Sequence, residues 1–116
     1  MGLFDASSTH HSKHVLVDAY RRFLVLSVVV SDSEKENNDF IYPHQSLSEL
    51  CRDDRDLLKV YLMDLNILAS KGYLEYQSTN DSFNTKLYKP TPKGLKYYMS
   101  NVSIAENSAV ALKDLR

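Results

Sequence analysis

Apolar residues recur at helical spacing in four segments of the chain and alternate with polar residues in two shorter ones. The first helical segment runs from about Ser12 to Val30. Its apolar positions cover a broad face, so we expect this helix in the middle of the domain or at a subunit interface. A brief helix beginning near Ser46 and a longer helix over about 55–71 follow as a closely spaced pair, and another helix begins after Thr91.

Local signals set the expected limits of these helices. Ser46 and Glu49 have the spacing of a capping box, in which each residue satisfies a backbone N–H of the other. Asp53 or Asp54 is expected to cap the longer helix, and Gly72 suits its C-terminal end. The inner face of that helix is expected to carry the apolar residues Leu58, Tyr61, Leu62, Leu65 and Leu68.

The remaining pattern predicts short strands. Phe40–Tyr42 is a brief extended run that stops at Pro43. Residues 73–77 and 86–89 read as the two strands of a hairpin around a polar loop over 78–85. Thr91 is then expected to cap a helix with Pro92 in its first turn. We expect this helix to pack on the core through Leu95, Tyr98 and Met99.

This order of elements, together with two short motifs, resembles the winged helix-turn-helix regulators of the MarR-like and PadR-like groups. The motifs are LNILASKGYLE at 65–75 and YKPTPKGL at 88–95. The resemblance implies an α+β fold: a winged helix-turn-helix with a three-helix core, a β-hairpin wing and an additional C-terminal helix. We expect a flexible N-terminal arm at 1–12, a winged-helix domain at 13–103, and a tail or short helix at 104–116.

The resemblance also implies a function and a set of residues. The protein is expected to bind double-stranded DNA as a homodimer, and to act as a transcriptional regulator or as a plasmid or phage accessory factor. The longer helix of the pair would enter the major groove, and the wing would lie on the backbone or in a minor groove. The candidate DNA-binding residues are Arg52, Arg55, Lys59, Met63, Asn84, Lys86 and Lys89.

The surface chemistry of the longer helix departs from that of most DNA readers. It begins with three acidic residues, Asp53, Asp54 and Asp56, which repel phosphate. An apolar stripe of Val60, Met63 and Ile67 also lies roughly opposite its inner face. This stripe either packs on the first helix or contacts another subunit, a partner protein or the terminal segment of the chain itself. The alternative function is therefore a winged-helix protein-interaction module that does not bind DNA.

The composition further limits the classes of protein to which this chain could belong. The chain has 116 residues and a net charge of −1, which predicts one domain without a strongly cationic coat. The lone Cys51 indicates a reduced core thiol, and no run of apolar residues is long enough to cross a membrane. With no leader pattern, we expect a cytoplasmic protein. His10 and His14 lack further metal ligands, and no catalytic motif is present, so we expect no metal, no cofactor and no enzymatic activity.

Overall fold

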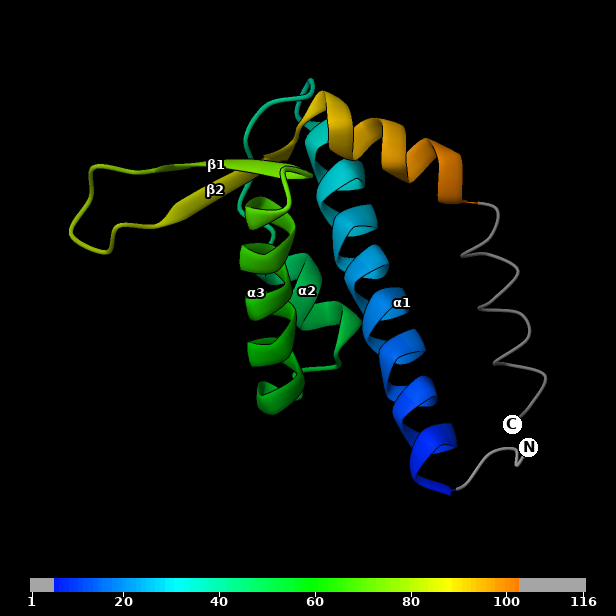
Figure 1. Ribbon diagram of the computed structural model, residues 1–116. Helices are drawn as coiled ribbons and strands as arrows, with labels where there is room; N and C mark the ends of the chain where they lie inside the picture. The colour runs from blue at the N-terminus through cyan, green and yellow to red at the C-terminus, as the bar shows by residue number, and fades with distance from the viewer. Residues whose placement is uncertain (1–5, 103–116) are drawn as a thin grey trace.

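The computed structural model describes residues 6–102, with side chains from Asp18 onward. This part of the chain is an α+β arrangement of four helices and one antiparallel hairpin (Figure 1). The labelled elements are α1 (Ala6–Lys35), α2 (His44–Leu50), α3 (Arg55–Ser70), β1 (Leu74–Ser78) and β2 (Lys86–Pro90). Residues 92–102 form the C-terminal helix. Among the described residues, no helix is both long and apolar enough to cross a membrane.

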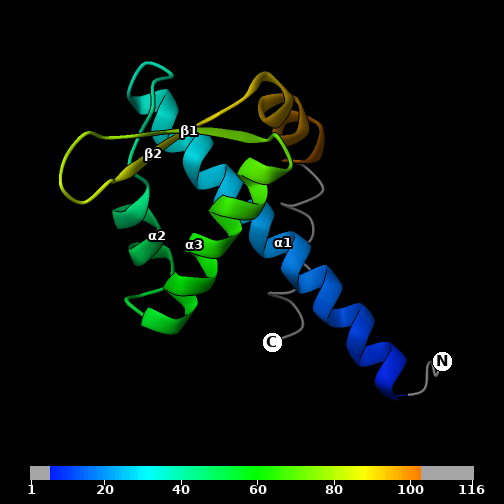
Figure 2. The ribbon, with the colours of Figure 1, turned by 60° about the vertical axis from the view of Figure 1, so that its left-hand side comes forward.

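Helix α1 is longer at both ends than the sequence predicts. It begins at Ala6 rather than Ser12, so much of the segment predicted as an arm is helical, and it continues past Val30 to Lys35. Val29 and Val30 are buried in the core, and this packing outweighs the weak helix propensity of β-branched residues. The N-terminal part of α1 projects beyond α2 and α3, as two views show (Figures 1 and 2).

The core lies where α2, α3 and the hairpin meet the C-terminal half of α1. Leu26 and Leu47 are fully buried there, and Leu65 and Leu74 are nearly so. Cys51 is also buried and donates its thiol to the Ser48 carbonyl at 3.3 Å, which confirms a core thiol. The core therefore joins all three labelled helices and both strands in one cluster.

The predicted capping box at Ser46 is wrong, whereas the cap of α3 is confirmed. Helix α2 begins at His44, directly after Pro43, so Ser46 lies inside the helix and no side chain caps its start. Pro43 precedes the first turn as the N-cap residue, and its φ of −83° is near the value that the proline ring imposes. At α3, the Asp54 carboxylate accepts from the backbone N–H groups of Asp56 and Leu57.

The hairpin follows the predicted order, with each strand shifted or extended by one residue. Cross-strand partners run from Leu74–Pro90 to Ser78–Lys86. The predicted extended run at Phe40–Tyr42 is present as a single antiparallel bridge between Ile41 and Tyr88, with two hydrogen bonds of 2.8 Å. This bridge ties the segment before α2 to the base of the hairpin.

A compact junction joins the hairpin, the end of α3 and the C-terminal helix. Gly72 ends α3 with a φ of +82°, a conformation that glycine adopts without strain. The Thr91 hydroxyl donates to the Gly72 carbonyl at 2.6 Å and accepts from the N–H of Gly94 at 2.9 Å. The predicted Thr91 cap is therefore confirmed, and it also fixes the hairpin relative to α3.

The C-terminal helix packs on the core through fewer residues than predicted. Tyr98 stacks on Phe23 of α1, with ring centroids 5.7 Å apart. Leu95 and Met99, in contrast, are exposed, so the expectation that they pack on the core is wrong for the described part of the chain. The predicted tail or helix at 104–116 lies outside the described residues.

Candidate nucleic-acid interface

One face of α3 is open to solvent along its whole length. It carries two cationic residues, one acidic residue, one methionine and two small polar residues. These exposed residues are Arg55, Asp56, Lys59, Met63, Asn66 and Ser70. Arg55 and Lys59 are four residues apart and so share one side of the helix. Asn66 continues that side toward the hairpin, and its amide can both donate and accept hydrogen bonds.

The apolar stripe predicted on the outside of α3 is largely covered. Val60 and Ile67 are half-buried, and only Met63 is strongly exposed, at 62%. Asp64, which lies between Val60 and Ile67 along the helix, accepts hydrogen bonds from Arg21 and Arg22 of α1, so this side of α3 packs toward α1. The stripe is therefore the edge of the contact between α3 and α1, and it does not form a separate apolar surface.

Asp64 is the centre of a buried ion-pair network that the sequence analysis missed. Its side chain accepts two hydrogen bonds from Arg21 of α1, at 2.6 and 3.0 Å, and a third from Arg22 at 3.3 Å. Arg21 also pairs with Asp18 at 2.6 Å. The hydrogen bond to Asp64 raises the pKa of Arg21 above its ordinary value, although burial opposes this shift. Two arginines of the chain are thus engaged in joining α1 to α3.

The hairpin carries its two candidate lysines on opposite faces. Lys86 lies on the same face as Tyr88, and its Nζ atom is 4.7 Å from the ring centroid of Tyr76. Lys89 lies on the other face, where its Nζ atom is 4.7 Å from the Phe40 centroid. Successive residues of a strand point to opposite sides, so Lys86 and Lys89 cannot contact one surface.

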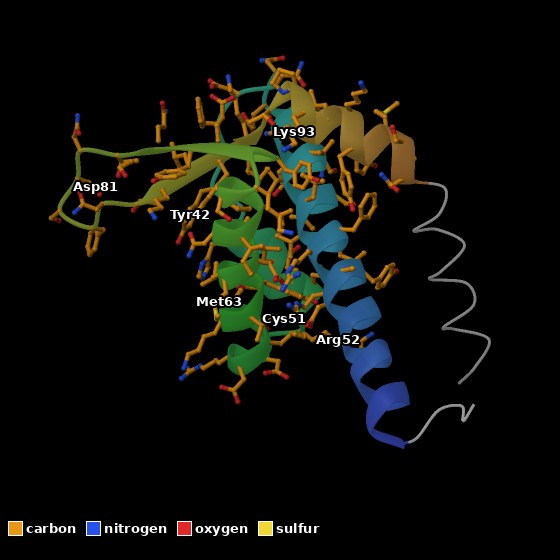
Figure 3. All side chains as sticks on the ribbon, in the orientation of Figure 1. Tyr42, Cys51, Arg52, Met63, Asp81 and Lys93 are labelled. Atoms are coloured by element: carbon orange, nitrogen blue, oxygen red, sulfur yellow. The ribbon has the colours of Figure 1, made fainter. Side chains whose placement is uncertain are left out.

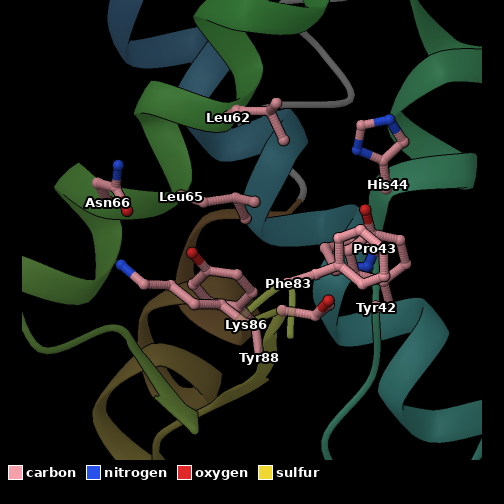
Figure 4. A pocket seen from close by; sticks show the side chains of 10 residues that line it. Tyr42, Pro43, His44, Leu62, Leu65, Asn66, Phe83, Lys86 and Tyr88 are labelled. Atoms are coloured by element: carbon pink, nitrogen blue, oxygen red, sulfur yellow. The ribbon is translucent and has the colours of Figure 1, made fainter. Parts of the chain in front are cut away.

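A groove of about 440 Å³ separates α3 from the hairpin (Figure 4). Its wall on the α3 side includes Leu62 and Asn66, and its wall on the hairpin side includes Lys86. The residues before and within the first turn of α2 complete it. The other lining residues are Tyr42, Pro43, His44, Leu65, Phe83, Thr85 and Tyr88. The lining of the groove is therefore mixed, with both polar and apolar side chains.

The structure brings together some of the predicted DNA-binding residues and separates others. Arg55, Lys59 and Met63 share the exposed face of α3. In Figure 3, Met63 lies on the side of α3 toward which the hairpin projects, whereas Arg52 lies on the side toward α1. Arg52 has a φ of +53° in the turn before α3 and is not part of the same face. Arg52 and Lys89 therefore lie apart from the α3 face and the groove.

Asn84 lies in the loop at the tip of the hairpin, with a φ of +48°. The adjacent Phe83 is the most exposed large apolar residue described, at 85%. Sequence reasoning missed Phe83, and also Tyr42, His44 and Asn66 as groove residues. A single aromatic residue in an otherwise polar loop was the available signal for Phe83. Nothing in the local sequence marks the groove, because it forms only when α3, α2 and the hairpin pack together.

Within residues 18–102, no three His, Cys, Asp or Glu side chains gather in a group that could hold a metal ion. The side chains of His10 and His14 lie outside the described ones. Comparison of the chain with known protein families, with curated proteins and with solved structures finds no significant match in any of the three.

Proposed function

We propose that the protein is a small winged-helix DNA-binding protein that binds duplex DNA as a homodimer. It would act as a transcriptional regulator or as a plasmid or phage accessory factor by occupying an operator-like site. In this arrangement α3 is the recognition helix and the hairpin is the wing. Helix α3 would enter the major groove, and the wing would reach the adjacent minor groove.

One observation carries this proposal: the outward face of α3 presents Arg55 and Lys59 to solvent, while two of the three residues of its apolar stripe are half-buried. Val60 and Ile67 are half-buried, whereas Arg55 and Lys59 are exposed. If the stripe were an interaction surface for another protein, its branched apolar residues would be expected to lie open. The Asp54 carboxylate caps α3 by accepting from the backbone N–H groups of Asp56 and Leu57.

The groove between α3 and the hairpin supports the same arrangement. A helix in the major groove and a wing in the next minor groove must straddle one sugar-phosphate strand. The groove provides space for such a strand, and His44, Asn66 and Lys86 line it with hydrogen-bond donors. Lys86 would contribute a phosphate contact there.

Dimerisation is part of the proposal because a single protomer offers few cations. Arg55, Lys59 and Lys86 are three positive charges on the proposed face, and affinity for DNA grows with the number of neutralised phosphates. Two protomers on a palindromic site would double these contacts. Leu95 and Met99 of the C-terminal helix are exposed apolar residues that a second subunit would bury, which supports a dimer.

The proposal is tested by fluorescence anisotropy with duplex DNA taken from upstream of the protein's own gene, titrated at several salt concentrations. Removing Arg55 and Lys59 together (Arg55→Ala, Lys59→Ala) is expected to weaken binding and to lower the magnitude of the salt slope by about two per protomer, one for each lost phosphate contact. Lys96→Ala is the matched control, because Lys96 is an exposed lysine on the C-terminal helix. Its affinity and slope should equal those of the unaltered protein.

Two results would contradict the proposal. The first is no binding by the unaltered protein at low ionic strength, where phosphate contacts are strongest. The second is equal loss of affinity in the Lys96 variant and in the Arg55 and Lys59 variant, which would mean that the protein binds by overall charge. A protein-interaction module is the second candidate, supported by the exposed Met63 on the outward face of α3. Failure of the protein to bind DNA would support this second candidate function.

A further inference from the structure

The loop at the hairpin tip exposes one large aromatic ring, that of Phe83. Its side chain is 85% exposed, more than any other large apolar residue described. An exposed phenylalanine loses the free energy of burying its ring, about 1.5–3 kcal/mol. The fold gains nothing visible from placing an aromatic ring at this position.

Hydrogen bonds within the loop hold the backbone around Phe83. The Asp81 carboxylate accepts from the N–H of Phe83 at 3.1 Å, and the Asp81 carbonyl accepts from the N–H of Asn84 at 3.3 Å. Below the tip, the N–H of Thr79 donates to the Thr85 carbonyl at 2.8 Å. These contacts form a turn, so the Phe83 ring extends from a loop whose backbone is held by hydrogen bonds. Figure 3 places Asp81 at the far end of the hairpin.

The ring faces the same side of the hairpin as the recognition helix. Phe83 lines the groove together with Leu62 of α3 and Lys86 of β2 (Figure 4). It therefore lies at the outer edge of the proposed DNA-binding face. If α3 occupies the major groove, this ring is carried to the neighbouring minor groove.

We propose that Phe83 is a wedge that inserts between base pairs in the minor groove and bends the DNA. This inference rests on the proposed function and specifies how the wing engages the duplex. Apolar side chains that enter a minor groove partly unstack one base step and kink the helix away from the protein. Lys86, whose Nζ atom lies over the Tyr76 ring in the free protein, would hold the adjacent phosphate strand.

A wedge of this kind selects DNA by its ease of deformation. Pyrimidine–purine steps such as TA and CA unstack most easily, so the preferred site should carry one under the wing. The preference would arise without a hydrogen bond between Phe83 and any base. A duplex in which that step is replaced by a stiff A-tract should then bind more weakly.

The test measures affinity and DNA bending separately on the same duplex. The probe is a duplex of about 30 base pairs containing the site found by anisotropy, with a fluorescence donor and acceptor at its ends. The unaltered protein is expected to increase energy transfer, and Phe83→Ala to abolish the increase with a loss of affinity of about 5- to 30-fold, which corresponds to about 1–2 kcal/mol of stacking. Phe83→Leu should keep most of the bend, because leucine also acts as a wedge.

Two further variants make the result specific. Ser82→Ala alters the neighbouring exposed loop residue and should leave both affinity and bending unchanged. Lys86→Ala should weaken binding, lower the magnitude of the salt slope and leave the bend of the saturated complex intact. The exposure of Phe83 means that Phe83→Ala should also leave the thermal midpoint within about 2 °C.

The outcomes separate this inference from the proposed function. Absence of binding by the unaltered protein contradicts the proposed function itself. Tight binding without a change in energy transfer, or equal bending by the unaltered protein and Phe83→Ala, leaves the proposed function in place and overturns the wedge. Loss of bending in Phe83→Ala with retention in Phe83→Leu supports it.

Discussion

Replacing Arg21 by methionine tests whether the ion-pair network at Asp64 determines the stability of the fold. Asp64 is completely buried, and Arg21 supplies two of its three hydrogen bonds from side chains. Arg21→Met keeps most of the side-chain volume and removes the charge. The carboxylate of Asp64 would then keep only Arg22, at 3.3 Å, as a charged partner.

The expected cost follows from the burial of this pair. Removing one partner of a buried pair destabilises a protein by about 3–5 kcal/mol, because the other charge stays buried without compensation. Arg21 is 19% exposed and Arg22 is 32% exposed, so water and the second arginine can partly replace the lost contacts. We therefore expect Arg21→Met to lower the free energy of unfolding by about 3 kcal/mol, the lower limit of this range. For a domain of this size, that corresponds to a fall in the thermal midpoint of roughly 12–24 °C.

Urea unfolding followed by circular dichroism measures this cost, and two further variants make the measurement specific. Arg22→Met removes only the longest of the three hydrogen bonds and should cost about 1 kcal/mol. Combining Arg21→Met with Asp64→Leu removes both charges, and an apolar replacement of a buried pair is often neutral or stabilising. The double variant should therefore be more stable than Arg21→Met alone. A loss below about 1 kcal/mol in Arg21→Met, or a double variant less stable than Arg21→Met, would refute the reasoning.

Three other predictions concern the hairpin junction, an internal tyrosine and the proposed dimer. Gly94→Ala should destabilise the protein by about 2 kcal/mol or more in thermal unfolding, because a Cβ atom would clash with the Tyr73 carbonyl; a midpoint unchanged within error would contradict this packing. Burial raises the pKa of Tyr88 above its ordinary value of 10.0, so the stability it contributes is present below that pH and is lost as pH rises through the folded pKa. In urea titrations from pH 9 to 12, the free energy of unfolding should fall less in Tyr88→Phe than in the unaltered protein. An equal fall in the two proteins would refute this. Leu95→Glu combined with Met99→Glu should convert a dimer into a monomer in light scattering, with the helix content unchanged; a persistent dimer would place the interface elsewhere.

Local signals in the sequence predicted those features whose physical cause is local. Asp54 caps α3 and Gly72 ends it, because a side-chain acceptor and a residue free to adopt positive φ act within one helical turn. The same reasoning failed at Ser46, where a capping-box spacing lies inside α2. The N-cap of that helix is Pro43, three residues before Ser46, and Leu47 of the helix lies fully in the core. A short motif could not show this outcome of packing.

The features that determine the candidate site depend on contacts between distant residues. Asp64 sits among apolar residues of α3, and its partner Arg21 is 43 residues away in the chain. A charged residue on an apolar face was visible in the sequence, but nothing local identified which arginine would compensate it. The sequence did indicate that Lys86 and Lys89 lie on opposite faces of the strand, because they are three residues apart. The groove required the packed arrangement of three elements.

The ion-pair network also bears on how a protein with a net charge of −1 could bind DNA. Arg21 and Arg22 neutralise the buried Asp64 and so are committed to the interior contact between α1 and α3. Asp64 lies on the opposite side of α3 from Lys59, so the same contact fixes which face of the helix is presented to solvent. The network therefore orients the few remaining cations, and few cations in a fixed arrangement favour specificity over general affinity for phosphate. On this reasoning, Arg21→Met should weaken DNA binding at temperatures where the variant remains folded, through misorientation of α3, with the magnitude of its salt slope unchanged. A reduction of that slope by one would instead identify Arg21 as a direct phosphate contact.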